Sequence, residues 1–315
     1  MFMANSTPSW RTKTLHDTSS ECPTKAGFVA VVGRPNAGKS SLLNWLLGEK
    51  VAMVSKKAQA TRKRMNVIVM HGNAQIIFVD TPGIHEKERL LNRFMLQEAV
   101  KAIGDCDLVL FLAPAKDRLD HYEKFLELNT KNRPHILVLT KTDEVSNEAL
   151  LRKISEYRKY QDRFLALVPV SVTKGVGKEQ LLDEIARHLP CSPWLYDPEL
   201  LTTTHIREIY KEMIRESIFE NLSDEIPYET DVIVDRIEEN PGLDRVQATI
   251  VTEKKSQKMI LVGRGGSTIK RIGRDARLKM ERFSGKKIYL ELFVSVKSGW
   301  SKNRHSLKEF GYVFD

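Results

Sequence analysis

Short apolar runs, each followed by a polar loop, dominate the first 190 residues. The segments GFVAVV (27–32), QIIFVDTPG (75–83), HILVLTKTD (135–143) and ALVPVSVT (166–173) all begin with such a run. Apolar runs without alternation are typical of strands buried on both faces of a parallel sheet. After the first run, SLLNWLLG spaces its leucines as a helix does. This half of the chain predicts an open α/β sheet.

The pattern changes after residue 200. Residues 204–222 place Ile, Met and Ile residues at helical spacing, whereas TDVIVDRIEE and RVQATIVTE alternate apolar with polar positions, as half-buried strands do. The intervening ENPGLD predicts a turn. Residues 256–285 predict two helices separated by glycines, and KKIYLELFVSVK predicts a final strand. The predicted order is α-β-β-α-α-β, an α+β domain.

These patterns divide the chain into four parts. We predict one domain over 27–190, a linker over 191–202 that carries Pro193 and Pro198, and a second domain over 203–315. Residues 1–26 are polar, rich in Ser and Thr and without a signal-peptide core, so we expect a disordered tail or a true start at Met3. Asp17 and Glu21 argue against an organellar transit peptide.

Composition narrows the class of protein. The chain has 315 residues, 41% hydrophobic and 29% charged, which is typical of a soluble globular protein. No apolar run approaches the roughly 20 residues of a transmembrane helix. Cys22, Cys106 and Cys191 are far apart and have no metal-ligand spacing. We therefore expect free thiols in a reducing, cytosolic compartment rather than a disulfide framework.

The loop after the first apolar run predicts a phosphate site. GRPNAGKS (33–40) fits G-x-x-x-x-G-K-[ST] and lies between a predicted strand and a predicted helix. Glycines let the backbone turn tightly, so that several N–H groups and the helix N-terminus face one phosphate. Lys39 can then reach the β- and γ-phosphates, and the Ser40 hydroxyl can bind Mg²⁺.

Three later segments indicate which nucleotide is bound. Asp80-Thr81-Pro82-Gly83 offers a carboxylate for Mg²⁺, through water, and a glycine N–H for the γ-phosphate. In Thr140-Lys141-Thr142-Asp143, the Asp143 carboxylate can accept two hydrogen bonds from guanine, which adenine cannot donate, and the Lys141 stem can cover the base. The Val172 N–H in Ser171-Val172-Thr173 can donate to guanine O6. Together, in this order, the motifs predict GTP or GDP.

The set of motifs over residues 28–190 resembles the translation-factor-like class of P-loop GTPases. The resemblance implies that Thr61 is the switch threonine at Mg²⁺ and the γ-phosphate. It implies a metal set of Ser40, Thr61 and Asp80, and a catalytic set of Lys39, Ser40, Thr61 and Gly83. The implied nucleotide-binding residues are Gly33, Asn36, Ala37, Gly38, Lys39, Ser40, Ser41, Asp80, Gly83, Thr140, Lys141, Asp143, Ser171, Val172 and Thr173.

Several positions depart from the commonest patterns of that class. Thr140 replaces the usual Asn of N-K-x-D, and Val172 replaces the usual Ala of S-A-x; we expect lost contacts but retained guanine specificity. Ile84 stands where Ras-like proteins have a water-orienting Gln, which predicts slow intrinsic hydrolysis accelerated by a partner. Asn36 matches the residue that binds K⁺ in related GTPases, so we expect a K⁺ site there.

Charge and a second glycine motif predict RNA binding by the second domain. Lys254 to Lys287 holds twelve Lys or Arg and two acids, a net +10, so the rest of the chain carries −1. Within it, Gly263-Arg264-Gly265-Gly266 fits the G-x-x-G turn of a type II KH domain, which lets RNA backbone approach closely. The expected RNA-binding residues are Gly263, Arg264, Gly265, Gly266, Lys270, Arg271 and Arg274.

One GTPase domain followed by one KH domain resembles the Era family of ribosome-associated GTPases. The tail from Lys286 to Val313, with Trp300 and Gly311-Tyr312, is especially similar. The resemblance implies a switch that binds the 3′ end of 16S rRNA and assists 30S subunit assembly and rRNA maturation. It also implies a cytoplasmic, monomeric protein with peripheral association at the inner membrane surface.

Four other protein classes share parts of these patterns. A tRNA-modifying GTPase would add a cofactor domain and a C-terminal cysteine, and a double GTPase would have two P-loops. A metabolic kinase would lack the guanine-reading Asp143. An RNA-binding adaptor with an inactive nucleotide site is disfavoured by Lys39, Ser40, Asp80 and Asp143, and turnover would separate it from a working GTPase.

Overall fold

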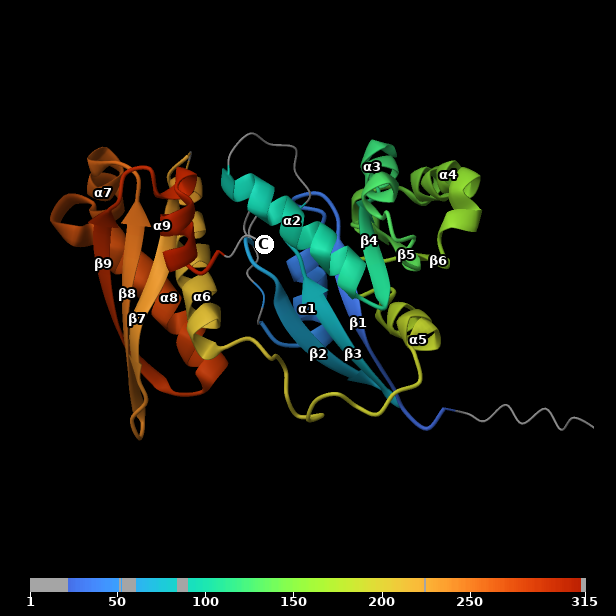
Figure 1. The fold of residues 1–315 in the computed structure, drawn as a ribbon, viewed down its shortest axis with the longest axis horizontal. Coiled ribbons are helices and arrows are strands. Elements are labelled where there is room, and N and C mark those ends of the chain that lie inside the picture. The colour runs from blue at the N-terminus through green and yellow to red at the C-terminus, as the bar shows by residue number, and fades with distance from the viewer. Residues whose placement is uncertain (1–21, 51, 53–60, 84–89, 224, 313–315) are drawn as a thin grey trace, which may run out of the picture.

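Two separate sheets organise the chain, one in each half of the sequence (Figure 1). The structure is a computed structural model, and it describes residues 22–50, 52, 61–83, 90–223 and 225–312. The first sheet has six strands in the order β2-β3-β1-β4-β5-β6, and the second has three in the order β7-β8-β9. The strands are β1 (Lys25–Val32), β2 (Met65–His71), β3 (Ala74–Asp80), β4 (Leu108–Pro114), β5 (His135–Thr140), β6 (Ala166–Pro169), β7 (Thr230–Glu238), β8 (Leu243–Thr252) and β9 (Lys287–Val296).

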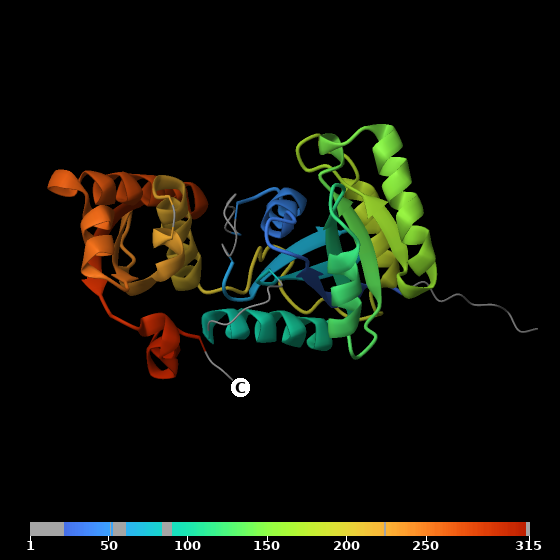
Figure 2. The ribbon, with the colours of Figure 1, turned by 90° about the horizontal axis from the view of Figure 1, so that it is seen from above.

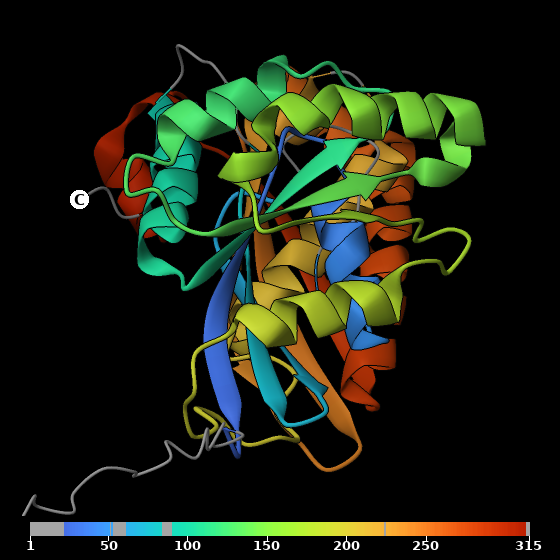
Figure 3. The same ribbon diagram turned by 90° about the vertical axis from the view of Figure 1, so that its right-hand side faces the viewer.

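Helices cover both faces of the first sheet and one face of the second (Figure 3). In the first half, α1 and α5 pack on one face of the sheet, and α2 and α3 pack on the other. The helices are α1 (Lys39–Leu47), α2 (Leu90–Asp105), α3 (Asp120–Leu128), α4 (Asn147–Tyr157), α5 (Lys178–His188), α6 (Ile206–Asn221), α7 (Lys255–Val262), α8 (Ser267–Ser284) and α9 (Arg304–Glu309).

The first sheet explains the long apolar runs of the sequence. Strands β3, β1, β4, β5 and β6 are mutually parallel, and every residue of β3, β4 and β5 is buried. Helices on both sides leave no face to water, so these strands need no polar alternation. β2 pairs antiparallel with β3 at the edge of the sheet. The parallel strands therefore bring their carboxyl ends, with the loops that follow them, to one rim.

The second sheet has the predicted alternation and a mixed topology. β7 pairs antiparallel with β8, and β8 pairs parallel with β9. One face packs on α6, α7 and α8 through a core that includes Ile214, Ile250 and Ile272. The predicted order α-β-β-α-α-β is present, and α9 is an addition that the sequence pattern did not predict.

The connection between the two sheets is held against the first one. The Gln75 side chain, fully buried in β3, bonds the backbone at Leu195 and Tyr196. Further along, the Ile68 N–H of β2 donates to the Leu201 carbonyl at 2.9 Å. The predicted linker therefore lies along the edge strand β2 instead of crossing open solvent.

One expectation about the cysteines is wrong. Cys22 and Cys191 form a disulfide, and only Cys106 among the three is a free thiol. The two residues meet because Cys191 forms a bridge with Lys25, at the start of β1. The sequence did not predict this contact because the two cysteines are 169 residues apart. In the fold, the strand that begins the domain and the segment that leaves it lie side by side.

The two halves meet through the C-terminal segment and helix α2 (Figure 2). Leu91, Phe94 and Met95 of α2 form a buried cluster with Trp300, Leu307, Phe310 and Tyr312, and Val251 of β8 joins it. The Phe94 and Tyr312 rings meet edge to face with centroids 5.2 Å apart. Within the part of the chain that the structure describes, no helix is long and apolar enough to cross a membrane.

Candidate functional sites

The four nucleotide motifs lie on the same rim of the first sheet. The loop at 33–38 follows β1, the loop at 81–83 follows β3, the loop at 141–143 follows β5 and the loop at 171–173 follows β6. These strands are parallel and share one sheet, so their carboxyl ends face the same way. The motifs, up to 140 residues apart in sequence, are thereby assembled into one site.

The first loop has the backbone that a phosphate site requires. Asn36 and Gly38 have left-handed φ values of 60° and 99°, and α1 begins at Lys39. Gly33 is tightly packed, because a Cβ there would lie 2.8 Å from the Leu112 carbonyl oxygen. Ala37 is fully buried, whereas Asn36 is exposed and Ser41 half-buried. The left-handed turn before a helix directs backbone N–H groups towards a bound anion.

Lys39 closes this loop from the inside. Its ammonium donates to the carbonyls of Gly33 and Arg34, at 3.1 Å each, and the side chain is buried. Burial lowers the pKa of Lys39 to about 8, although Asp80 opposes the shift. The terminal phosphates of a nucleotide would give this buried ammonium anionic oxygens to bond in place of the two carbonyls.

Three oxygen side chains converge beside it and fit Mg²⁺. Ser40 Oγ lies 3.0 Å from Asp80 Oδ2 and 3.2 Å from Thr61 Oγ1, and Thr61 Oγ1 lies 3.3 Å from Asp80 Oδ2. Among the described residues, Asp80 Oδ1 is buried without a hydrogen-bond partner. Burial raises the pKa of Asp80 to about 6, against the effect of Lys39 and the two hydroxyls. Hard oxygen ligands with one unsatisfied carboxylate oxygen are a donor set that Mg²⁺ accepts.

Gly83 packs directly on the phosphate loop. A Cβ on Gly83 would lie 2.8 Å from Pro35 N and 2.9 Å from Pro35 Cγ. Two residues earlier, the buried Thr81 hydroxyl donates to the Val31 carbonyl at 2.6 Å. The loop after β3 is thus fixed against β1 at one end and against the phosphate loop at the other. Ile84, on which the expectation of slow hydrolysis rests, is outside the described residues.

The residues expected to read the base form the other side of the site. Ser171 Oγ donates to Asp143 Oδ1 at 2.6 Å and thereby lowers the pKa of Asp143, which keeps the carboxylate ionised. Lys141 has a left-handed φ of 57°. Val172 is half-buried and Thr173 exposed, in a turn closed by pairing of Ser171 with Val176.

Thr140 stands where the motif usually has Asn, a change for which we expect lost contacts, and its side chain still contacts the phosphate loop. Its buried hydroxyl donates to the Ala37 carbonyl at 2.8 Å. The base-reading loop is therefore fastened directly to the phosphate loop. A second fastening was not predicted: the Arg34 guanidinium pairs with the Asp117 carboxylate through two hydrogen bonds. The sequence did not indicate this pair, because Arg34 and Asp117 are 83 residues apart and neither belongs to a motif that names the other.

The second domain presents the G-x-x-G turn between α7 and α8. Gly263, Gly265 and Gly266 all have positive φ, and a Cβ on Gly265 would meet nothing within 4 Å. Arg264, Lys270, Arg271 and Arg274 are all exposed around this turn, and Arg271 donates to the Asn221 carbonyl at 3.1 Å. An open glycine turn, a helix N-terminus and four cations form a surface suited to a nucleic-acid backbone.

Comparison with known proteins finds a match for each of the two domains. Residues 28–141 match the family model described as a 50S ribosome-binding GTPase, and residues 213–301 match the KH domain model. The chain is 50% identical to GTPase Era of Campylobacter concisus over 289 residues, 91% of this chain and all of that protein. It is also 50% identical to GTPase Era of Helicobacter pylori, over 92% of this chain and 97% of that protein.

Two solved structures share the whole fold. One is a variant of Aquifex aeolicus Era bound to GDP and AlF₄⁻, with a TM-score of 0.88 and 32% identity. The other is Era in complex with MgGDPNP and nucleotides 1506–1542 of 16S ribosomal RNA, with a TM-score of 0.88 and 33% identity. Each match covers 92% of this chain and all of the other.

Proposed function

The chain belongs to the Era family of GTPases, and on that premise we propose that it is a GTP-driven switch for small-subunit ribosome assembly. In this proposal, the GTP state binds the single-stranded 3′ end of 16S rRNA through the G-x-x-G face, and hydrolysis to GDP permits release. The bound RNA places the protein on the assembling 30S subunit, where it assists rRNA maturation.

One observation carries the proposal: an intact nucleotide rim and an open, basic G-x-x-G turn occur in one chain. The rim brings Lys39, Ser40, Thr61 and Asp80 within one corner, which an RNA adaptor without turnover would not need. The turn and the N-terminal part of α8 carry exposed cations. A solved relative of the same fold holds MgGDPNP and a 16S rRNA fragment together, which supports the same pairing here.

The geometry of the rim supports a proposed role in hydrolysis for several residues. Lys39 stabilises charge on the β- and γ-phosphates, and the Gly83 N–H orients the γ-phosphate. Ser40, Thr61 and Asp80 hold Mg²⁺, which when bound neutralises phosphate charge. Asn36 is exposed at the mouth of the phosphate loop, where its side chain can bind K⁺. Intrinsic turnover is slow, and a partner accelerates it.

We also propose a cellular setting, for which membership of the family is the support. The protein acts as a monomer in the cytoplasm, with peripheral association at the inner membrane. Guanine specificity rests on Asp143, with Lys141 over the base and the Val172 N–H at O6. In this proposal, the nucleotide state of the first domain determines when the RNA is released, and the second domain determines which RNA is bound.

RNA binding with matched variants tests this function. We expect the full chain to bind an oligonucleotide of the 16S rRNA 3′ end more tightly than a scrambled one at the same salt concentration. Arg264→Ala should weaken binding five- to tenfold and reduce the salt slope by about one charge. Arg118→Ala removes the same charge from a side chain that is 88% exposed in the first domain, and should change neither. Equal binding of target and scramble would contradict the proposal.

A further inference from the structure

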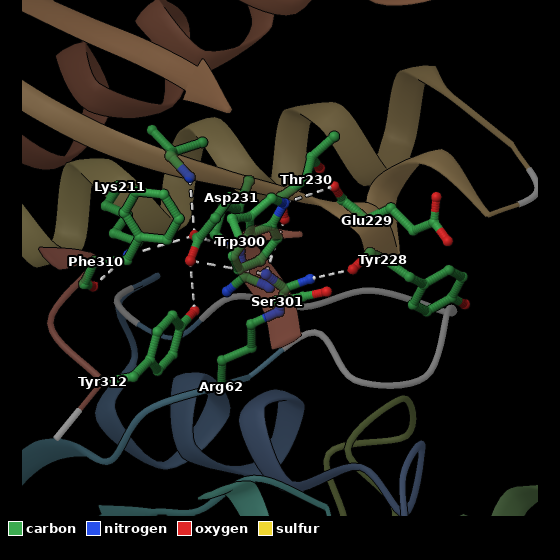
Figure 4. Close-up of polar contacts among 12 residues, drawn as sticks. Arg62, Lys211, Tyr228, Glu229, Thr230, Asp231, Trp300, Ser301, Phe310 and Tyr312 are labelled. Carbon is green, nitrogen blue, oxygen red and sulfur yellow. Dashed lines mark hydrogen bonds and ion pairs between the residues drawn. The ribbon is translucent and has the colours of Figure 1, made fainter. Parts of the chain in front are cut away.

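Two consecutive residues of the first domain contact different parts of the molecule. Thr61 reaches the magnesium corner, where its hydroxyl lies 3.2 Å from Ser40 Oγ and 3.3 Å from Asp80 Oδ2. Arg62 points away from that corner and into the second domain, where it is 1% exposed (Figure 4). Consecutive Cα atoms are a fixed 3.8 Å apart, so a displacement of Arg62 displaces Thr61.

Backbone carbonyls of the second domain hold the Arg62 guanidinium. Nη1 donates to the Thr230 carbonyl at 2.8 Å, and Nη2 donates to the Tyr228 carbonyl at 2.9 Å. The guanidinium also lies 5.9 Å from the centre of the Trp300 ring. This is a socket for a planar cation with several donors, which a lysine ammonium would fill incompletely.

A buried carboxylate lies at the base of the socket. Asp231 is fully buried and pairs with Lys211 at 3.3 Å and with Arg62 and Arg215 at 3.8 Å each. The Tyr312 hydroxyl donates to Asp231 Oδ2 at 2.7 Å. Burial alone would raise the pKa of Asp231, but the three cations hold it below its usual range. Removal of a partner from such a cluster leaves buried charge unbalanced, so the socket strongly fixes Arg62.

The same C-terminal segment also contacts α2, the helix that comes next in the chain after the loop of Gly83. Tyr312, which bonds Asp231, packs edge to face on Phe94 of α2 at 5.2 Å. Helix α2 follows the loop that contains Gly83. Tyr312 is therefore connected to both segments expected at the γ-phosphate. Through Asp231 it is connected to Arg62, which follows Thr61, and through Phe94 it contacts α2, which comes after the loop of Gly83.

We propose that Arg62 is a positioning residue: the docked second domain holds it, and it holds Thr61 at the magnesium corner. Preference for GTP over GDP then depends on the arrangement of the two domains, since only a triphosphate with Mg²⁺ uses Thr61. The inference rests on the proposed function in one respect, the assignment of Thr61 to Mg²⁺. It predicts that a substitution in the second domain changes nucleotide affinity although the substituted residue does not contact the nucleotide.

Nucleotide affinities of full-length variants test the proposal. Fluorescent GDP and a non-hydrolysable GTP analogue would be titrated with Mg²⁺ and with EDTA. Arg62→Ala should weaken binding of the GTP analogue at least tenfold in Mg²⁺, with GDP affinity changed less than twofold. The difference should disappear in EDTA. Arg62→Lys should recover only part of the loss, because it restores the charge without the forked donors.

Arg64→Ala is the matched control. Arg64 is two residues further along, and it pairs with Glu98 at 2.8 Å and Asp105 at 3.7 Å, both in α2 of its own domain. This variant should retain the wild-type ratio of the two affinities. An Arg62→Ala protein that binds both nucleotides with the wild-type ratio would overturn the proposal.

A second variant covers the case in which Arg62→Ala does not fold. Tyr312→Phe keeps the ring on Phe94 and removes only the hydrogen bond to Asp231. It should shift the same ratio in the same direction, by about two- to threefold. No shift in this variant would equally contradict the proposal. RNA affinity measured on the same proteins separates the two ideas: selective RNA binding with an unchanged nucleotide ratio removes this inference and leaves the proposed function intact.

Discussion

At the scale of single residues, much of the specificity depends on a few carboxylates whose charge is fixed by their neighbours. Asp143 accepts a hydrogen bond from Ser171, and Asp231 is surrounded by three cations. Both have a pKa below the usual range, so both are ionised under physiological conditions. Asp143 is at the nucleotide rim, so loss of its charge should change ligand binding. Asp231 is in the protein interior, so loss of its charge should change stability.

Replacement of Asp143 should change which base is bound. Asp143→Asn exchanges an acceptor for a donor, and guanine then faces a donor opposite its own N–H groups. We expect GTP affinity to fall at least a hundredfold, since a guanine N–H donor loses the acceptor that the site provides for it. Xanthosine triphosphate, which has a carbonyl where guanine has an amino group, should bind the variant better than GTP does. Competition binding with both nucleotides measures this, and unchanged preference for GTP would refute the assignment.

Replacement of Asp231 should reveal a pH-dependent contribution to stability. Its folded pKa is below the unfolded value of 3.8, so its stabilising effect is present above that value and is lost as pH falls towards the folded pKa. At neutral pH, Asp231→Asn should cost about 3–5 kcal/mol, because it removes the anion that three buried cations share.

Urea unfolding across pH provides the measurement. The stability gap between wild type and Asp231→Asn should narrow below about pH 4, where the Asp231 carboxylate of the unfolded chain begins to bind protons while that of the folded chain is still ionised. Asp235→Asn on the exposed side of β7 is the control and should cost less than about 1 kcal/mol. A gap of constant size down to pH 3 would contradict the assignment of this charge.

At the scale of elements, the G-x-x-G turn is the segment whose backbone most restricts its sequence. Gly263 and Gly265 both have positive φ, of 72° and 57°. A Cβ on Gly263 would lie 2.4 Å from Thr268 Oγ1 and 2.8 Å from Thr268 N, whereas a Cβ on Gly265 would stand in open space. The first glycine is therefore required by the fold, and the second by whatever approaches the turn.

Alanine at the two positions should separate these requirements. Gly265→Ala should cost only about 1 kcal/mol of stability, the cost of a left-handed alanine. Gly263→Ala should cost roughly 2–4 kcal/mol, since α8 must also shift to relieve the contact. RNA affinity should fall in both variants. Equal melting temperatures of the two variants would show that the close packing at Gly263 does not constrain the turn.

Elements differ in how well the sequence predicted them, for identifiable reasons. The buried parallel strands and the glycine turns were predicted because their apolar runs and fixed spacings are local features. The edge strand β2 and the short helix α9 were not, since their patterns are brief. Arg62 is followed directly by Lys63 and Arg64, and nothing in the local sequence distinguishes it from these two cations. Its socket around Thr230 lies far along the chain, as does the Cys191 that pairs with Cys22.

At the scale of the whole molecule, the nucleotide rim and the RNA face belong to separate domains, which ion pairs connect in addition to the buried cluster of α2 and the C-terminal segment. Lys50, just after α1, pairs with Glu216 of α6, which also pairs with Lys279 of α8. Arg62 and Tyr312 form the second connection. Helix α8 carries the basic residues after the G-x-x-G turn. A change at the nucleotide can therefore be transmitted through these contacts to the RNA-binding helix.

The most direct test is the affinity of the full chain for the 16S rRNA 3′-end oligonucleotide in two nucleotide states. The same preparation would be loaded with GDP and then with a non-hydrolysable GTP analogue, at fixed salt and Mg²⁺. We predict that the GTP form binds the target at least fivefold more tightly, and that a scrambled oligonucleotide binds weakly in both states. Equal affinity for the target in the GDP and GTP states would contradict a switch that couples the two domains.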